Sequence, residues 1–525
     1  MTKNQKNILY NFLKICYSEY VNKMCRHERG SRSRVRTAAF TDIFEGGRTM
    51  QTTPILVVIA YMAIMMGIGF YVAKKQIKDS KDYMIAGRRM GLFMVAFSLS
   101  ANNVGGGSTT GLAAKAFGDW GMSACWYVLA AAIAMIPLSY FAPKIRKTMA
   151  VTIPEVVGRR FGKLSCNFTA VLNVAALFCL TSSQIAASGV VISTLTGMPQ
   201  NIALVMATVI VILYTTFGGM IADQVCDLIQ FCVILIGLAI ATPMVINGVG
   251  GWSAVAEALP PVQLSFTKIG WVTIIGYIFN YFCTFLSGPE MVSRFESAKD
   301  EKTAQRASLL SGVLMAAMSL FPTILGLAAL AVKDSLPALA ANGSNAMMEV
   351  ASAYAPGVVT GIVAAAIICA TMSSADSNLL CMSTMVMNDL VFGNGFCKNM
   401  EDKKVLLTTR IMNVVFAIGA MCISLLGIPI VNLNTFAFGI RCAGPFAAYG
   451  LGMMVEKATK NAGVLSIITG TIGFVFWQIL SKGGFLFGIL PVVFGCAIGA
   501  ATFFIVNAIE LKAGKPVAPS AFIEQ

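Results

Sequence analysis

The sequence predicts an all-α polytopic membrane protein with about thirteen transmembrane helices. Hydrophobic residues make up 57% of the 525 residues and charged residues only 12%, whereas a soluble domain has about 25% charged residues. Thirteen apolar stretches have about 18 residues or more, which is enough to cross a hydrocarbon core of roughly 30 Å. These stretches do not alternate apolar and polar residues, as the strands of a β-barrel do.

The thirteen stretches define the predicted helices in chain order. Their ranges are 54–73, 92–114, 122–142, 167–196, 200–218, 226–247, 270–289, 307–332, 357–388, 405–427, 429–453, 463–480 and 484–507. The predicted membrane domain is therefore 50–510, followed by a short tail, 511–525.

The net charge of +15 is explained by basic loops and needs no nucleic-acid partner. Lysines and arginines gather in alternate loops, which all fall on one side of a thirteen-helix chain. The basic loops are 74–89, 144–163, 294–306, 398–404 and 457–460, and the loops nearly free of Lys and Arg are 197–199, 248–269 and 333–356. Basic loops stay in the cytoplasm, so we expect a cell-membrane protein with its N-terminus outside and its C-terminus in the cytoplasm.

The segment 1–49 does not fit this charge pattern, because it holds ten Lys and Arg against four Asp and Glu on the predicted outer side. One interpretation is a disordered basic tail, or a helix count that is wrong by one. Another is a start at Met50, because Glu-Gly-Gly-Arg at 45–48 can be encoded by a purine-rich run that resembles a ribosome-binding site.

The residue types disfavour an enzyme. The single histidine, His27, lies in the N-terminal tail, and no HExxH motif occurs. Most of the 14 cysteines lie within apolar stretches, where a small buried hydrophobic role is favoured over disulfides or metal binding.

Two of the predicted helices carry breaks in matching places. The stretch 92–114 contains FSLSANNVGGGSTTG (97–111), and 270–289 ends on Gly288-Pro289; glycine and proline both weaken a helix. The two helices are five apart, so they cross the membrane in opposite directions. We therefore predict two inverted repeats, 92–247 and 270–453, and a binding site at the membrane midplane, as in secondary transporters. A channel is disfavoured by the same pattern.

The run ATMSSADSN (370–378) places hydroxyl groups inside an apolar helix. Ala370, Ser373, Ser374 and Ser377 are spaced i, i+3, i+4 and i+7, so they share one helix face. One interpretation is that each serine bonds to the carbonyl four residues earlier in its own helix. The other is that this face, with freed carbonyls near Ala101 and Val104, binds a hard cation.

Several motifs together resemble the sodium/solute symporter family, which includes sodium/proline, sodium/pantothenate and sodium/galactose carriers. They are YMIAGRRMG (83–91), SANNVGG (100–106), TTFGGMIADQVCDLIQ (215–230), GPEMVSRF (288–295) and ATMSSADSNLL (370–380). The resemblance covers about 50–510. It implies the five-plus-five inverted repeat of leucine-type (LeuT-like) transporters with discontinuous helices, one extra helix before it (54–73) and two after it (463–507).

The resemblance also implies ion-binding residues, with Na⁺ as the coupling ion. The main sodium site would use carbonyls of Ala101, Val104 and Ala370 and hydroxyls of Ser373 and Ser374. A second ion site would use Asp227, Asp376 and Ser377. Asp376 stands where such relatives have a serine, so it marks a second ion, a proton or only a structural hydrogen bond.

The solute is expected beside the two helix breaks. The substrate-binding candidates are Asn103, Gly105, Tyr281, Phe285, Ser287, Pro289 and Arg441. Ordinary helix packing is the alternative for the two aromatic residues. Arg441 lies in the middle of a predicted helix, where a cation needs a partner: either a substrate carboxylate or an internal acid such as Asp376 or Glu290.

The predicted function is therefore sodium-coupled symport of a small organic solute, a carboxylate or an amino-acid-like molecule, by alternating access. Proton coupling through Asp227 and Asp376 is the alternative. We expect the protein to act as a monomer in the lipid bilayer.

Overall fold

The computed structural model describes residues 52–76, 84, 86–215, 219–336, 343–396, 400–481, 484, 486 and 489–522. The predicted tail 1–49 and the proposed start at Met50 lie outside these residues, as do parts of the motifs at 83–91 and 215–230.

The described residues form helices, with isolated β-bridges but no named strand. The α-helices are α3 (Thr52–Gln76), α5 (Leu92–Asn103), α6 (Leu112–Phe117), α7 (Trp126–Lys147), α8 (Ile153–Phe161), α9 (Lys163–Thr196), α10 (Gln200–Thr215), α11 (Met220–Val249), α12 (Gly251–Ala258), α13 (Trp271–Leu286), α14 (Pro289–Ser297), α15 (Glu301–Met318), α16 (Leu320–Ala331), α18 (Ala346–Tyr354), α19 (Gly357–Met385), α20 (Asp402–Ser424), α21 (Ile430–Ala443), α22 (Gly452–Met454), α23 (Lys460–Leu480) and α24 (Pro491–Lys512). Three π-helical segments continue α-helices: Gly107–Gly111, Val386–Phe392 and Ala447–Leu451. Short 3₁₀ turns cover Ala86–Arg88, Gly121–Cys125, Pro261–Leu264, Lys333–Ser335 and Gly343–Asn345.

In the part of the chain that the structure describes, nine helices are long and apolar enough to cross a membrane, or ten when the bent pair α13 and α14 counts as one span. Three predicted ranges do not hold a single helix that is long and apolar enough to cross a membrane. The range 92–114 is divided between α5 and α6, 200–218 holds the 16-residue α10, and 429–453 is divided among α21, a π-helical segment and α22. The prediction of a multi-pass helical protein is confirmed, and the count of thirteen stays a prediction.

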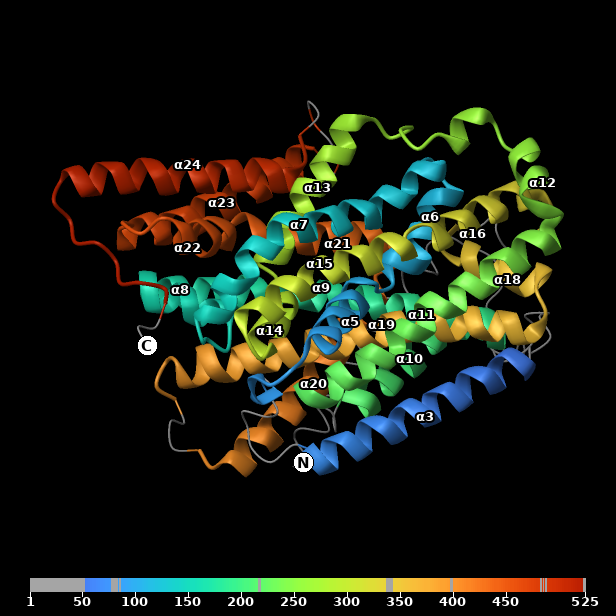
Figure 1. Cartoon of the computed structure of the whole chain (residues 1–525), viewed down its shortest axis with the longest axis horizontal. Helices are drawn as coiled ribbons and strands as arrows, with labels where there is room; N and C mark the ends of the chain where they lie inside the picture. The colour runs from blue at the N-terminus through green and yellow to red at the C-terminus, as the bar shows by residue number, and fades with distance from the viewer. Residues whose placement is uncertain are drawn as a thin grey trace, which may run out of the picture. The chain divides into compact units, whose positions relative to one another are not determined.

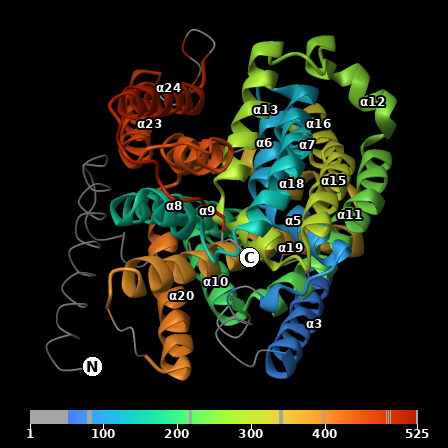
Figure 2. The same cartoon turned by 60° about the vertical axis from the view of Figure 1, so that its left-hand side comes forward.

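Helix α19, which carries the serine face, lies at the centre of the bundle (Figure 1). In its most apolar window 89% of the residues are buried, compared with 11% in α3. It contacts α3, α5, α9 and α11, whereas α3 and the pair α23–α24 lie at different sides of the bundle (Figure 2). Many apolar side chains of α3, such as Leu56, Ile59 and Ile64, are exposed, which is expected of a helix that faces lipid.

The first helix break separates α5 from α6. Helix α5 ends at Asn103, and the chain passes through Val104, Gly105 and Gly106 before the π-helical turn at Gly107. An added Cβ at position 105 would lie 2.6 Å from Gln184 Oε1 and 2.7 Å from Ser374 Oγ, so a larger residue there would displace these side chains. The break therefore lets the backbone of α5 approach both α9 and α19.

The second break separates α13 from α14, which are bent by 57°. Ser287 N–H still bonds to the Cys283 carbonyl, but Pro289 has no N–H to continue the ladder and instead starts α14. Helix α14 carries Glu290 and Arg294, so this break directs two charged side chains into the protein interior.

The loop after α14 leads into a helix with a capped N-terminus. Asp300 accepts a hydrogen bond from the N–H of Thr303 at 2.7 Å and caps α15. That bond lowers the pKa of the Asp300 carboxyl below its ordinary value.

Candidate functional site

The serine face of α19 meets the broken end of α5. Ser373 Oγ donates to the Ala101 carbonyl at 3.0 Å, and Ser374 Oγ donates to the Asn102 carbonyl at 2.9 Å. All of these residues are buried. The structure thus brings Ala101, Ser373 and Ser374 together, although they are about 270 residues apart in the sequence.

The same two hydroxyls also lie close to the carbonyl of Ala370 in their own helix, at 3.0 Å and 3.1 Å. The serine hydroxyls therefore lie near carbonyls of both helices, and cation binding by this face stays a prediction. A hydroxyl has one hydrogen to donate, so two hydroxyls cannot satisfy all the lone pairs of the three carbonyls that face them. This junction is rich in oxygen lone pairs, which is what a hard cation requires.

Val104, the remaining predicted sodium ligand, lies at the C-cap of α5 and is fully buried. Its N–H bonds to the Ser100 carbonyl. The carbonyl beside Ser374 belongs instead to Asn102, which the sequence analysis did not select. Which backbone carbonyl lies beside Ser374 depends on the residue at which α5 unwinds. The sequence alone does not determine that residue.

A second buried cluster lies one helical turn further along α19, around the guanidinium of Arg294. Arg294 Nη2 forms ion pairs with Asp223 and with Asp227, the latter at 3.2 Å, and bonds to Ser377 Oγ. Ser98 Oγ donates to Asp227 at 2.5 Å. The predicted residues Asp227 and Ser377 are therefore neighbours, but an arginine lies between them.

Asp376 belongs to the same cluster, because its side chain contacts those of Asp223 and Thr215. Two buried carboxylates pair with the guanidinium and the third contacts Asp223, so the fully ionised cluster has two more negative charges than positive ones. Asp227 Oδ1 is buried without a hydrogen-bond partner within the described structure. An unpaired buried carboxylate oxygen is costly, so this cluster favours a further cation or proton.

An internal cavity of about 40 Å³ lies beside the α5 break. Its walls come from α5, α7, α9, α13, α14, α19 and α21, so it lies among both predicted repeats. The lining residues are Asn102, Asn103, Gly105, Gly107, Ser108, Tyr127, Leu180, Gln184, Tyr281, Phe285, Glu290, Ser374, Asn378, Asn434, Phe438 and Arg441.

Arg441 and Glu290 form an ion pair at the wall of this cavity. Arg441 Nη1 lies 2.5 Å from Glu290 Oε1, and the guanidinium also lies over the ring of Phe438, 5.1 Å from its centroid. Within the described residues, Arg441 Nε and Nη2 and Glu290 Oε2 have no hydrogen-bond partner. The pair is thus internally neutral but retains free donors and a free acceptor.

The structure brings most of the predicted substrate residues to this cavity. Asn103, Gly105, Tyr281, Phe285 and Arg441 line it. Tyr281 also packs against Phe285, with ring centroids 5.3 Å apart, so its packing role is present as well.

Two predicted substrate residues lie elsewhere. Ser287 Oγ donates to the Cys283 carbonyl at 2.7 Å, and Pro289 lines a separate small cavity with Val292 and Leu380. The bend between α13 and α14 turns these positions away, and a sequence pattern does not give the direction of a bend.

Sequence reasoning missed Gln184 and Asn434. Gln184 Oε1 accepts a hydrogen bond from the Gly106 N–H at 2.6 Å. This bond stabilises the backbone at the break between α5 and α6. Both residues lie in short polar runs within apolar stretches, TSSQ (181–184) and NLNT (432–435), and that is the signal by which they could have been found.

The chain is similar to members of a known family of transporters. Residues 83–470 match the sodium:solute symporter family. Two sodium/proline symporters from Staphylococcus aureus strains are each 25% identical to the chain, over 497 and 494 residues, covering 89% of this chain and 94% of each relative.

Solved structures share the fold. A substrate-bound, outward-open Na⁺-coupled sialic acid symporter superposes with a TM-score of 0.75 at 20% identity, covering 89% of this chain and 99% of the other. A nucleobase-cation-symport-1 family transporter in a closed conformation gives 0.55 at 14% identity, covering 82% and 94%. The predicted inverted-repeat fold with discontinuous helices is thus confirmed.

The family match spans most of the chain, and it includes both helix breaks and the serine face of α19. The chain therefore belongs to the sodium:solute symporter family, a family of membrane transporters for which Na⁺ is the coupling ion.

Proposed function

We propose that this symporter carries a small solute with a carboxylate group, together with Na⁺, by alternating access. The observation that carries the proposal is the Arg441–Glu290 pair, which lines a cavity beside the oxygen-rich junction of α5 and α19 and retains donors and an acceptor without hydrogen-bond partners in the described structure. The solute and the ion would then both bind beside the break at the end of α5.

Sodium would bind between the two helices. Its ligands would be the carbonyls of Ala101, Val104 and Ala370 and the hydroxyls of Ser373 and Ser374. Each hydroxyl now donates to carbonyls on both helices, so on binding it would turn a lone pair toward the ion. The ion would replace weak shared hydrogen bonds with direct coordination and fix the unwound segment in one shape.

The solute carboxylate would bind Arg441 through Nε and Nη2, the edge of a guanidinium that suits bidentate contact. An amino group on the solute would find an acceptor in Glu290 Oε2. The relatives support this class, because proline and sialic acid both carry a carboxylate. The cavity of about 40 Å³ has room for only a few waters, so Arg441 and Glu290 must separate to admit the solute.

The acidic cluster around Arg294 would hold a second cation. Asp227, Asp376 and Ser377 supply oxygens there, and Arg294 compensates only part of the negative charge. One elementary charge crossing 100 mV is worth about 2.3 kcal/mol, which is about fiftyfold in accumulation. A second ion would therefore steepen the dependence of uptake on voltage and on sodium concentration.

A single chain supplies every residue of the cavity and of both ion clusters, so we propose that the monomer is the transporting unit.

Uptake into proteoliposomes tests the proposal. Purified full-length protein would be given inward Na⁺ or K⁺ gradients at fixed pH and voltage, with labelled carboxylates, amino acids and sugars. We expect sodium-dependent uptake of carboxylate-bearing solutes only. Uptake that is equal in Na⁺ and K⁺, or that selects uncharged sugars, would overturn it.

Two variants separate the parts of the proposal in the same assay. The double variant Arg441→Gln with Glu290→Gln keeps the site neutral but removes the guanidinium that would donate to the solute carboxylate. The solute concentration for half-maximal uptake should therefore rise about tenfold or more. With two bound ions, uptake by the unchanged protein should rise sigmoidally with sodium concentration. In Asp376→Asn, which weakens the second site, this dependence should become hyperbolic. A sigmoidal curve in that variant would place the second ion elsewhere.

A further inference from the structure

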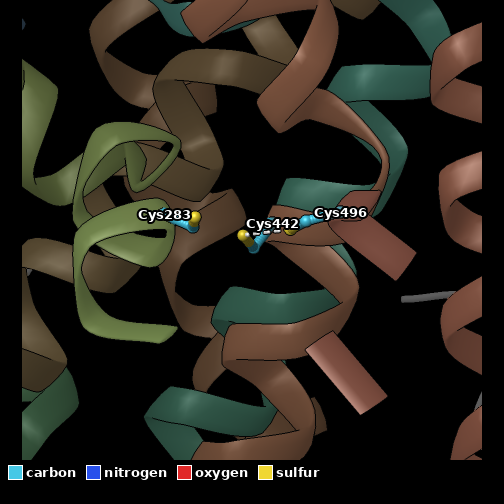
Figure 3. Close-up of side chains that lie close together, drawn as sticks. All are labelled: Cys283, Cys442 and Cys496. Carbon is cyan, nitrogen blue, oxygen red and sulfur yellow. Dashed lines mark hydrogen bonds between the residues drawn. The ribbon is translucent and has the colours of Figure 1, made fainter. Parts of the chain in front are cut away.

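Three cysteines from three helices meet in the protein interior, outside the cavity. They are Cys283 of α13, Cys442 of α21 and Cys496 of α24, and Figure 3 shows Cys442 between the other two. Their sulfur atoms all lie within 4.8 Å of one another, and Cys442 Sγ lies 3.3 Å from Cys496 Sγ. All three are free thiols and at most 2% exposed.

This spacing suits a shared metal ion. Metal–thiolate bonds are about 2.3 Å long, so three sulfurs around one ion in a plane lie about 4 Å apart. The Cys442–Cys496 separation of 3.3 Å is shorter than this, and all three sulfurs lie within 4.8 Å of one another, so small shifts of the side chains would reach it. Within the described residues, no other group of three His, Cys, Asp or Glu side chains is close enough to hold an ion in this way.

The surroundings select the kind of ion. Leu490, Val492, Phe282 and Phe446 pack with the three cysteines in one apolar cluster, so the site is lined mainly by apolar side chains. Zinc takes four ligands in closed sites, whereas soft thiolates alone suit copper(I).

We propose that Cys283, Cys442 and Cys496 form a binding site for a soft monovalent metal ion such as copper(I). Cys442 is the central ligand, because its side chain lies between those of Cys283 and Cys496 (Figure 3). Binding releases the proton of each thiol that becomes a thiolate and changes no oxidation state.

A bound ion would join α13 to α21 and α24. Helix α13 carries Tyr281 and Phe285 of the cavity, and α21 carries Arg441. An ion that holds these helices together would restrain any movement between them, so copper(I) would slow transport as well as bind.

Metal binding to purified full-length protein tests this site. The protein would be titrated under argon with copper(I) buffered by bicinchoninate, and bound copper would be counted by elemental analysis. We expect one ion per chain in the unchanged protein, with sulfur ligands in X-ray absorption, and loss of that ion in Cys283→Ala, Cys442→Ala and Cys496→Ala alike.

Cys125→Ala is the matched control, because Cys125 is a buried thiol of another element, Gly121–Cys125. It should keep the ion. Copper binding that survives Cys442→Ala, or that is lost equally in Cys125→Ala, would overturn the proposal. So would a mass loss of two hydrogens without bound copper, since that indicates a disulfide between Cys442 and Cys496.

Discussion

At the scale of single residues, the hydroxyls of Ser373 and Ser374 have two roles that share one geometry. Each lies within 3.1 Å of a carbonyl on α19 and of another on α5. The first contact is local and is available to any helical serine. The second depends on the break in α5, and it makes the two hydroxyls candidates for ion ligands.

Replacing Ser374 by alanine tests that role. The variant loses one ligand oxygen, and a hydrogen bond or ligand to a charged group is worth about 1.5–3 kcal/mol. We expect the sodium concentration for half-maximal uptake to rise by about tenfold to a hundredfold, measured in proteoliposomes at fixed solute concentration.

Ser383→Ala is the control on the same helix. Ser383 is buried, and its hydroxyl bonds to the Leu380 carbonyl of its own helix at 3.0 Å. Its removal should leave the sodium dependence unchanged. An unchanged sodium dependence in Ser374→Ala would remove this residue from the ion site.

Sequence periodicity was sufficient to place Ala370, Ser373 and Ser374 on one face, because the helical period fixes relative directions. It was not sufficient for Gln184 or Asn434. Each contributes a polar atom from a helix whose rotation and depth are set by tertiary packing.

At the scale of elements, the two helix breaks organise the site. Glycines and a proline predicted both breaks, and the structure has them at Val104–Gly106 and at Gly288–Pro289. The breaks have different consequences: the first frees carbonyls toward α19, and the second turns Glu290 and Arg294 inward. Composition predicted where the helices stop, but the 57° bend was decided by packing.

Gly105→Ala tests the close approach at the first break. An added Cβ would lie 2.6 Å from Gln184 Oε1 and 2.7 Å from Ser374 Oγ, so the break must open. We expect uptake to fall strongly and the apparent sodium affinity to weaken about tenfold or more, by loss of an interaction with a charged group.

Gly67→Ala is the matched substitution in α3, where nothing lies within 4 Å of the added Cβ. Alanine is about 1 kcal/mol better than glycine within a helix, so this variant should be as stable as the original or slightly more so, with unchanged uptake. If Gly105→Ala behaves like Gly67→Ala, the break does not need a glycine there.

At the scale of the whole molecule, basic loops determine orientation. We propose that the loop carrying Lys302 faces the cytoplasm and that the loop carrying Ser335 faces outward. Both side chains are exposed, so neither position is constrained by packing.

Reporter fusions in a bacterial host test this orientation. Alkaline phosphatase folds only outside the cytoplasm, so a fusion after Ser335 should be active and a fusion after Lys302 inactive. A green fluorescent protein fused after Gln525 should fluoresce. The reverse pattern would invert the proposed topology.

The sequence by itself determined the membrane class, the helical fold, the positions of the two breaks and the hydroxyl face of α19. These properties depend on composition and on the helical period, which are local. Only the tertiary structure decided that Asn102 faces Ser374, that Arg294 lies among Asp223, Asp227 and Ser377, and that Glu290 is the partner of Arg441. It also decided that three cysteines meet. These pairings join helices that are far apart in the chain, and their rotation and depth are fixed by packing against one another.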